Sequence, residues 1–117
     1  MQAGLGRWRR IASAATFKQA LATRPRARGP FFDVLCLNPD VADRAGSRLG
    51  LVVAKRICRS AVARNRAKRL IRESFRLAMP AEIPIDCVVR LRRCLAPADL
   101  PAARCELSAH WRTVCAR

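Results

Sequence analysis

The sequence predicts an α+β fold in which one sheet is covered by helices in a two-layer sandwich. Two observations predict it. Short runs rich in branched and aromatic residues alternate with longer runs in which apolar residues recur every three or four positions. The chain has 117 residues, enough for one hydrophobic core and too few for two domains. The resulting order of helix, strands, helix, strand and helix is that of an α+β sandwich.

The N-terminal part predicts a basic arm followed by a short helix. Residues 1–12 contain glycines and arginines, and we expect them to be poorly ordered, ahead of a single domain at residues 13–117. Ser13 can cap a helix that ends near Ala22. Two prolines and a glycine in residues 23–30 then interrupt regular structure.

Two strands are predicted next, followed by a long helix. Residues 31–38 and 49–55 are dense in apolar residues and read as strands on either side of a turn-rich connection. A helix is predicted from residue 61 or 62 to Ala78, and Pro80 follows its end. Its apolar positions have the three-and-four spacing of a helix face laid on a sheet. They are Ala63, Ala67, Leu70, Ile71, Ser74/Phe75 and Ala78.

The C-terminal part predicts a third strand and a last helix. In residues 85–93 one set of side chains alternates with another, as in a strand with two distinct faces. Asp99 is a plausible N-cap for the helix that follows. Its apolar stripe is formed by Ala103, Leu107, Trp111 and Val114/Cys115.

The charge of the chain indicates a polyanionic partner. The formal net charge is +16, and from Arg48 to Arg76 ten Arg or Lys side chains stand against a single acid, Glu73. Such an excess speeds association with nucleic acid. A run of charged residues is often only a solvated helix face, but such faces usually carry both positive and negative side chains, whereas this segment is almost entirely positive. Charge alone does not separate RNA from DNA.

The cations of the long helix have a definite spacing. One ridge repeats every four residues, and Arg69 and Asn65 lie beside it; the ridge consists of Arg64, Lys68, Arg72 and Arg76. Like charges at this spacing repel one another in a free helix. Guanidinium groups bind phosphate oxygens two at a time, so a phosphate backbone would relieve this repulsion.

Several other classes of site have little support in the sequence. No apolar run reaches eighteen residues, so no transmembrane helix is expected. A cytoplasmic location is expected instead. The single histidine, His110, has no catalytic partners in a recognisable motif, and neither a catalytic residue nor a metal site is predicted. The six cysteines are expected to be free thiols, because the disulfide alternative needs an export signal that we do not find.

Residues 48–77, RLGLVVAKRICRSAVARNRAKRLIRESFRL, closely resemble the signature of the bacterial ribonuclease P protein component. Lys55 and Arg56 match the basic pair that ends the family's strand. The Arg-Asn-Arg core and its continuation follow at the family's spacing, in Arg64, Asn65, Arg66, Lys68, Arg69, Leu70, Ile71, Arg72, Glu73 and Phe75. A weaker similarity extends from Ser13 to Arg93. The resemblance implies a two-layer α/β sandwich around a central mixed sheet, of the type also found in a ribosomal protein domain. It also implies a left-handed β-α-β crossover, where the general rule predicts a right-handed one.

The resemblance also implies a function. The family protein is the non-catalytic subunit of an endoribonuclease that removes 5′ leaders from precursor tRNA. In that family the RNA subunit carries the chemistry with Mg²⁺, and one protein binds each RNA. The residues implied to contact the catalytic RNA are Arg64, Asn65, Arg66, Lys68, Arg69 and Arg72. Those assigned to the precursor leader are Phe17, Lys18, Phe32, Lys55, Arg56 and Arg90. Both phenylalanines read equally well as ordinary core.

Three other functions share some of these features. A ribosomal or other structural RNA-binding protein would share the size, charge and sandwich fold. A helix-turn-helix DNA-binding protein fits less well, because the basic helix follows a strand and its cations form a phosphate-binding ridge rather than a base-reading face. A membrane-active helix fits least, because the apolar face of the basic helix is mostly alanine.

Overall fold

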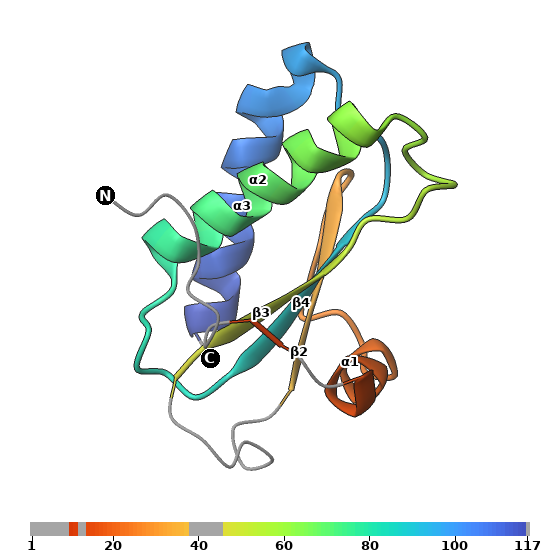
Figure 1. The fold of residues 1–117 in the computed structure, drawn as a ribbon. Coiled ribbons are helices and arrows are strands. Elements are labelled where there is room, and N and C mark those ends of the chain that lie inside the picture. Colours follow the sequence, from red (N-terminus) through yellow and green to blue (C-terminus); the bar gives the residue numbers. More distant parts are fainter. Residues whose placement is uncertain (1–9, 12–13, 38–45, 117) are drawn as a thin grey trace.

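The computed structural model describes residues 10–11, 14–37 and 46–116. The elements in chain order are α1 (Ala14–Leu21), β1 (Ala27–Arg28), β2 (Phe32–Leu37), β3 (Arg48–Val52), α2 (Ala61–Ala78), β4 (Asp86–Leu91), the 3₁₀ turn η3 (Pro97–Asp99) and α3 (Leu100–Ala116) (Figure 1). Most of the predicted arm, the Ser13 cap and most of the connection between β2 and β3 lie outside the described residues. The limit between arm and domain therefore stays a prediction.

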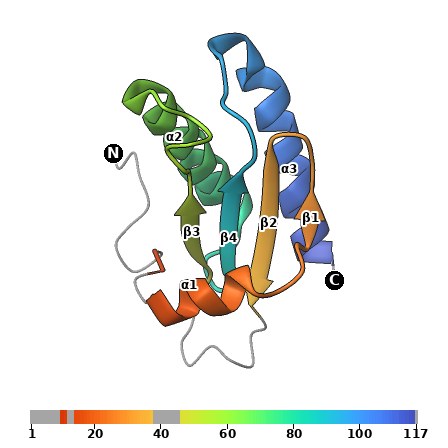
Figure 2. The same cartoon turned by 90° about the vertical axis from the view of Figure 1, so that its right-hand side faces the viewer.

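The sheet is mixed, and its four strands lie in the order β1-β2-β4-β3. β1 pairs with β2 and β2 pairs with β4 in antiparallel fashion, whereas β3 and β4 are parallel. Figure 2 shows that the chain leaves β3, runs behind the sheet through α2 and returns in β4 on the right of β3. This is a left-handed crossover, as the resemblance implied and against the general rule.

The two faces of the sheet are covered unequally. Helices α2 and α3 pack together against one face, and α1 lies across one end of the other (Figure 2). Residues 10–11 continue the small α1 layer: Arg10 bridges to Leu49 of β3, and the Ile11 N–H donates to the Leu49 carbonyl at 3.0 Å. Ile11 is buried with Ala20 and Val88 beneath α1. Among the described residues, no helix covers the part of this sheet face that lies beyond α1.

Helix α2 begins and ends where its sequence indicates. The Ser60 hydroxyl accepts a hydrogen bond from the Ala63 N–H at 3.2 Å, which caps the first turn. The predicted apolar face is buried at Ala63, Ala67, Leu70, Ile71 and Phe75. Only the last predicted position, Ala78, is exposed, because the helix ends there and Met79 takes its place in the core.

Two local predictions were wrong. The interrupted segment 23–30 contains strand β1, which is only two residues long and is extended by the Arg26 N–H donating to the Val34 carbonyl at 2.7 Å. Asp99 does not cap α3: its carboxylate accepts from the Ala96 N–H at 2.9 Å and closes the 3₁₀ turn before the helix. In both cases a hydrogen bond, rather than a periodic pattern of apolar residues, determines the conformation of a short backbone segment.

The cysteine prediction was also wrong for one pair. Cys58 and Cys94 form a disulfide, with Cα atoms 4.9 Å apart. They follow β3 and β4 respectively, and parallel neighbours end at the same edge of a sheet, so the fold brings together residues that are distant in sequence. Cys36 and Cys87 remain thiols, paired across β2 and β4 with their sulfurs 3.6 Å apart. The bond to Cys36 and then burial raise the pKa of Cys87 well above its ordinary value.

Helix α3 is fastened to the β1–β2 turn by a carboxylate. Glu106 accepts the N–H of Phe32 at 2.8 Å and that of Phe31 at 3.2 Å. The Nε2 of His110 lies 3.1 Å from the Glu106 carboxylate and 3.2 Å from the Phe32 carbonyl, so Nε2 faces two acceptors and carries the hydrogen. Glu106 also lies against Gly29, where a Cβ would collide with it. His110 thus has a structural part in the fold.

The Glu106→Gln variant is expected to lower the free energy of unfolding by about 1–3 kcal/mol. Glutamine keeps the size of the side chain and one acceptor oxygen, but it loses the negative charge, and its NH₂ group cannot accept the bond that the second carboxylate oxygen takes from the Phe31 N–H. Urea unfolding measures the loss, and the exposed Glu82→Gln supplies a matched control expected to change stability by less than about 0.5 kcal/mol. Equal unfolding midpoints for the two variants would contradict this account of Glu106.

Candidate nucleic-acid interface

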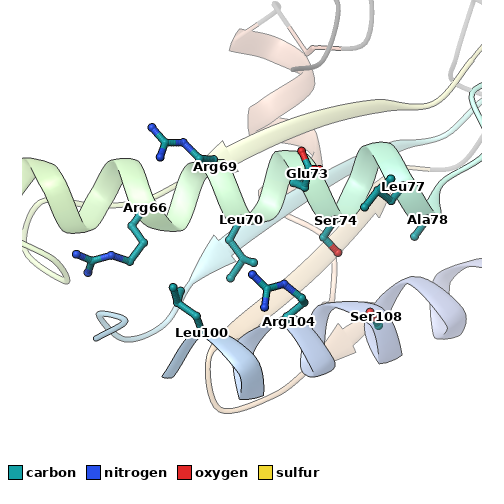
Figure 3. A pocket seen from close by; sticks show the side chains of 10 residues that line it. All are labelled: Arg66, Arg69, Leu70, Glu73, Ser74, Leu77, Ala78, Leu100, Arg104 and Ser108. Atoms are coloured by element: carbon teal, nitrogen blue, oxygen red, sulfur yellow. The ribbon is translucent and has the colours of Figure 1, made fainter. Parts of the chain in front are cut away.

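The cations of α2 do not form one surface, because they flank the buried face of the helix on both sides. Arg66 and Arg69 line a groove between α2 and α3 (Figure 3). Lys68 and Arg72 line a separate cleft along the edge strand β3, which Phe17 of α1 also lines and which we call the cleft under α1. The four-residue ridge predicted from the sequence therefore accounts for only part of the arrangement. The helix presents positive charge both to the groove beside α3 and to the cleft under α1.

The cleft under α1 joins an aromatic ring of α1 to cations from two other segments, residues 10–11 and α2. It has a volume of about 230 Å³, and Phe17 of α1, Gly50 of β3, Arg10, Lys68 and Arg72 contribute to its lining. A Cβ added to Gly50 would lie 2.6 Å from the Phe17 ring, so the ring lies directly on the glycine backbone. Only a residue without a side chain permits this approach.

The positive charge in this cleft is unfavourable for the protein alone. Burial lowers the pKa of Arg72 from its ordinary value, and the nearby charge of Arg10 lowers it further. Both effects disfavour the cationic form of Arg72. An anion bound in the cleft would counter the repulsion between the two arginines.

The remaining residues of the Arg-Asn-Arg core lie at the start of α2. Arg64 is held in place because it donates to the carbonyls of Cys58 at 3.1 Å and Arg59 at 2.8 Å. Asn65 is exposed on the outer side of the helix. Arg66 donates to the Leu95 carbonyl at 3.1 Å. The disulfide partners Cys58 and Cys94 thus adjoin the backbone that orients two of the arginines.

The residues predicted to hold a leader are only partly brought together. Phe17 lines the cleft with half-buried Arg72 beside it, and Lys18 is exposed on α1. Lys55 and Arg56 are exposed in the turn after β3. None of these three lysine and arginine side chains lines the cleft.

Two members of the predicted leader set lie apart from that cleft. Arg90 faces the uncovered side of the sheet but forms an ion pair with Asp33, with nitrogen and oxygen 2.9 Å apart. Phe32 is fully buried in the core that α2 and α3 cover. Its ring cannot stack on a base without leaving that core, so we correct its assignment as a leader contact.

Sequence reasoning missed three contributors to these surfaces. Arg10 fell within the arm predicted to be poorly ordered, and Arg104 of α3 carried no pattern that linked it to α2. Gly50 stood inside a predicted strand, and an isolated glycine there is a signal of close backbone approach. That signal could have indicated that a side chain, here the Phe17 ring, packs directly on this glycine.

The described residues contain no recognisable metal centre. Among them, no three His, Cys, Asp or Glu side chains lie together as a metal site requires. No helix in the part of the chain that the structure covers is long and apolar enough to cross a membrane.

Comparison with known proteins gives one consistent result. The Ribonuclease P family model matches residues 5–115. The ribonuclease P protein component of Bordetella parapertussis is 46% identical over 114 residues, which are 90% of each chain. A Staphylococcus aureus RNase P protein mutant with defective mRNA degradation activity superposes with a TM-score of 0.72 at 27% identity, over 93% of this chain and 89% of that one. The RNase P protein of Thermotoga maritima, at 24% identity and a TM-score of 0.62 over 84% and 90% of the two chains, has the same fold.

The match thus spans both the basic helix and the sheet that carries it, and it covers 89–90% of the length of each of these relatives. On these grounds the chain belongs to the ribonuclease P protein component family.

Proposed function

We propose that this protein binds the catalytic RNA of ribonuclease P and the 5′ leader of precursor tRNA, and so supports 5′ maturation of tRNA. The observation that carries the proposal is the division of the α2 cations between two sites. A subunit that contacts two RNAs at once needs two cationic surfaces, and a single helix with charge on both flanks supplies them.

The outer and α3-facing residues of α2 are assigned to the catalytic RNA. Arg64, Asn65, Arg66 and Arg69 lie outside the α1 cleft, and their guanidinium and amide groups suit phosphate and sugar contacts. Such contacts position an RNA without reading its sequence. This fits a partner recognised by its shape.

The cleft under α1 is assigned to the leader. A single strand is held by stacking on aromatic rings and by cations along its backbone. Phe17 supplies a ring. Lys68 and Arg72, which the resemblance assigned to the catalytic RNA, lie in the same cleft as Phe17 and are here reassigned to the leader. Lys18, Lys55 and Arg56 would extend the positive track at its margins. Arg90 is a weaker candidate, because Asp33 already offsets its charge.

The chemistry is assigned to the RNA subunit. The protein would bind and position RNA, and Mg²⁺ would be required by the RNA-containing enzyme rather than by the protein alone. We further propose one protein for each catalytic RNA, acting in the cytoplasm as part of an endoribonuclease. Positive charge next to the RNA would lower the Mg²⁺ concentration that the complex needs.

Cleavage of a 5′-leadered precursor tRNA by a bacterial ribonuclease P RNA at low Mg²⁺ tests this function. The native chain should stimulate cleavage, and the Arg64→Ala/Arg66→Ala/Arg69→Ala variant should lose that stimulation. Circular dichroism would verify that the variant is folded. Tight, salt-sensitive RNA binding without any stimulation would instead favour a ribosomal or other structural RNA-binding protein.

A further inference from the structure

The groove between α2 and α3 combines an apolar floor with a positive rim. Its volume is about 590 Å³ (Figure 3). Leu70, Leu77 and Leu100 line it, and Leu77 is 70% exposed. A leucine so exposed, next to arginines and at a groove, is available to a partner with a flat apolar surface.

The rim carries three arginines from two helices. Arg66 of α2 and Arg104 of α3 extend on the side of the groove, whereas Arg69 borders it from the side of α2 that faces away from α3 (Figure 3). Within residues 10–11, 14–37 and 46–116, none of the three forms an ion pair. The acid that also lines the groove, Glu73, is engaged by Arg76 at 2.8 Å. The rim therefore favours an anionic partner.

Two hydroxyl groups lie along the same groove. The Ser74 oxygen accepts the indole N–H of Trp111 at 2.8 Å, and its own hydrogen is left to donate. Ser108 lines the groove from α3. Polar groups next to an apolar floor can hydrogen-bond the edge of a planar ring whose face lies on the leucines.

We propose that this groove receives one unpaired nucleotide of the catalytic RNA, turned out of its stack. The base would lie against Leu70, Leu77 and Leu100, and the flanking phosphates would be bound by the rim arginines. Unpaired bases are the parts of RNA that proteins can surround in this way, and guanidinium planes stack on them. The proposal rests on the proposed function and deepens it, because it adds α3, through Arg104, to the RNA interface.

The choice of RNA over a protein partner follows from charge. A protein helix docked in the groove would need acidic side chains at three places around its apolar face. A nucleotide brings a flat base and a phosphate on either side in a fixed covalent arrangement. The apolar floor and the separate cations of the groove match that arrangement directly.

Binding of a bacterial ribonuclease P RNA by single variants tests the proposal. Arg104→Gln is expected to weaken binding about tenfold and to reduce the log–log salt slope by about 0.7–0.9, the effect of one lost phosphate contact. Arg112→Gln is the matched control, because Arg112 is another exposed arginine of α3 outside the groove. It should change both quantities much less.

The inserted base has its own readout. Dimethyl sulfate and carbodiimide, which modify unpaired bases, should find a base that the native protein protects. Leu77→Asn should leave the protein folded, since Leu77 is largely exposed, and should restore reactivity at that base.

Three results would overturn the proposal. The first is equal behaviour of Arg104→Gln and Arg112→Gln. The second is the absence of any base that the native protein protects and Leu77→Asn exposes. The third is a dimer of the chain in sedimentation that Leu77→Asn disrupts, since a second copy would then occupy the groove. The proposed function has a separate test, and it would fail if the native protein did not stimulate cleavage of the precursor tRNA.

Discussion

Replacing Arg66 and Arg69 together by glutamine is expected to weaken binding to a bacterial ribonuclease P RNA about a hundredfold. The magnitude corresponds to two lost charge-assisted contacts of about 1.4 kcal/mol each. Neither residue lines the cleft under α1. At saturating protein, the preference for leadered precursor over mature tRNA should therefore persist.

The Lys68→Gln/Arg72→Gln variant is expected to show the opposite pattern. Both residues lie in the α1 cleft, so the preference for the leadered substrate should fall about tenfold or more while the catalytic RNA is still bound. Filter binding at several salt concentrations and competition between precursor and mature tRNA would separate the two effects. Arg24→Gln/Arg112→Gln removes the same charge from exposed positions outside both sites. If all three pairs lost affinity equally, only the net charge would matter.

Trp111→Ala is expected to lower the free energy of unfolding by about 3–5 kcal/mol. The indole is 2% exposed, meets the Phe75 ring edge-on with centroids 5.4 Å apart, and donates to Ser74 at 2.8 Å. Alanine removes the contact that joins α3 to α2 and leaves a cavity between the helices. Because domains of this size have about 5–15 kcal/mol of stability, the variant should be close to unfolding.

Urea unfolding followed by circular dichroism would measure this loss. Trp111→Phe is the control, because it keeps an aromatic ring but not the hydrogen bond to Ser74, and should cost less than half as much. A small effect of Trp111→Ala would mean that the groove between the two helices does not depend on this contact.

The fold could be predicted from the sequence where periodicity decides the structure. The apolar spacing of α2 located the buried face at Ala67, Ile71 and Phe75 without tertiary information. The handedness of the crossover could not be obtained in this way, because no local pattern distinguishes the two hands, and it came only from the resemblance. The strand β1 was missed because two residues carry no periodicity.

The sequence indicated which residues of α2 carry positive charge, but not how those residues are arranged around the fold. A helical repeat shows that Arg66 and Lys68 point in different directions, but not which neighbour each one meets; α3 and α1 decide that. Every residue of β2 is buried, so its sequence does not show which face is open. For this reason Phe32 and Phe17 looked alike, although one lies in the core and the other on the cleft.

The pairing of residues 10–11 with β3 has a consequence for solubility. β3 is the last strand of the sheet, and a bare strand edge is a template on which other chains can pair and aggregate. The chain itself occupies part of that edge, through the bridge between Arg10 and Leu49 and the burial of Ile11. The same short segment thus brings a cation to the cleft and shields the sheet from self-association.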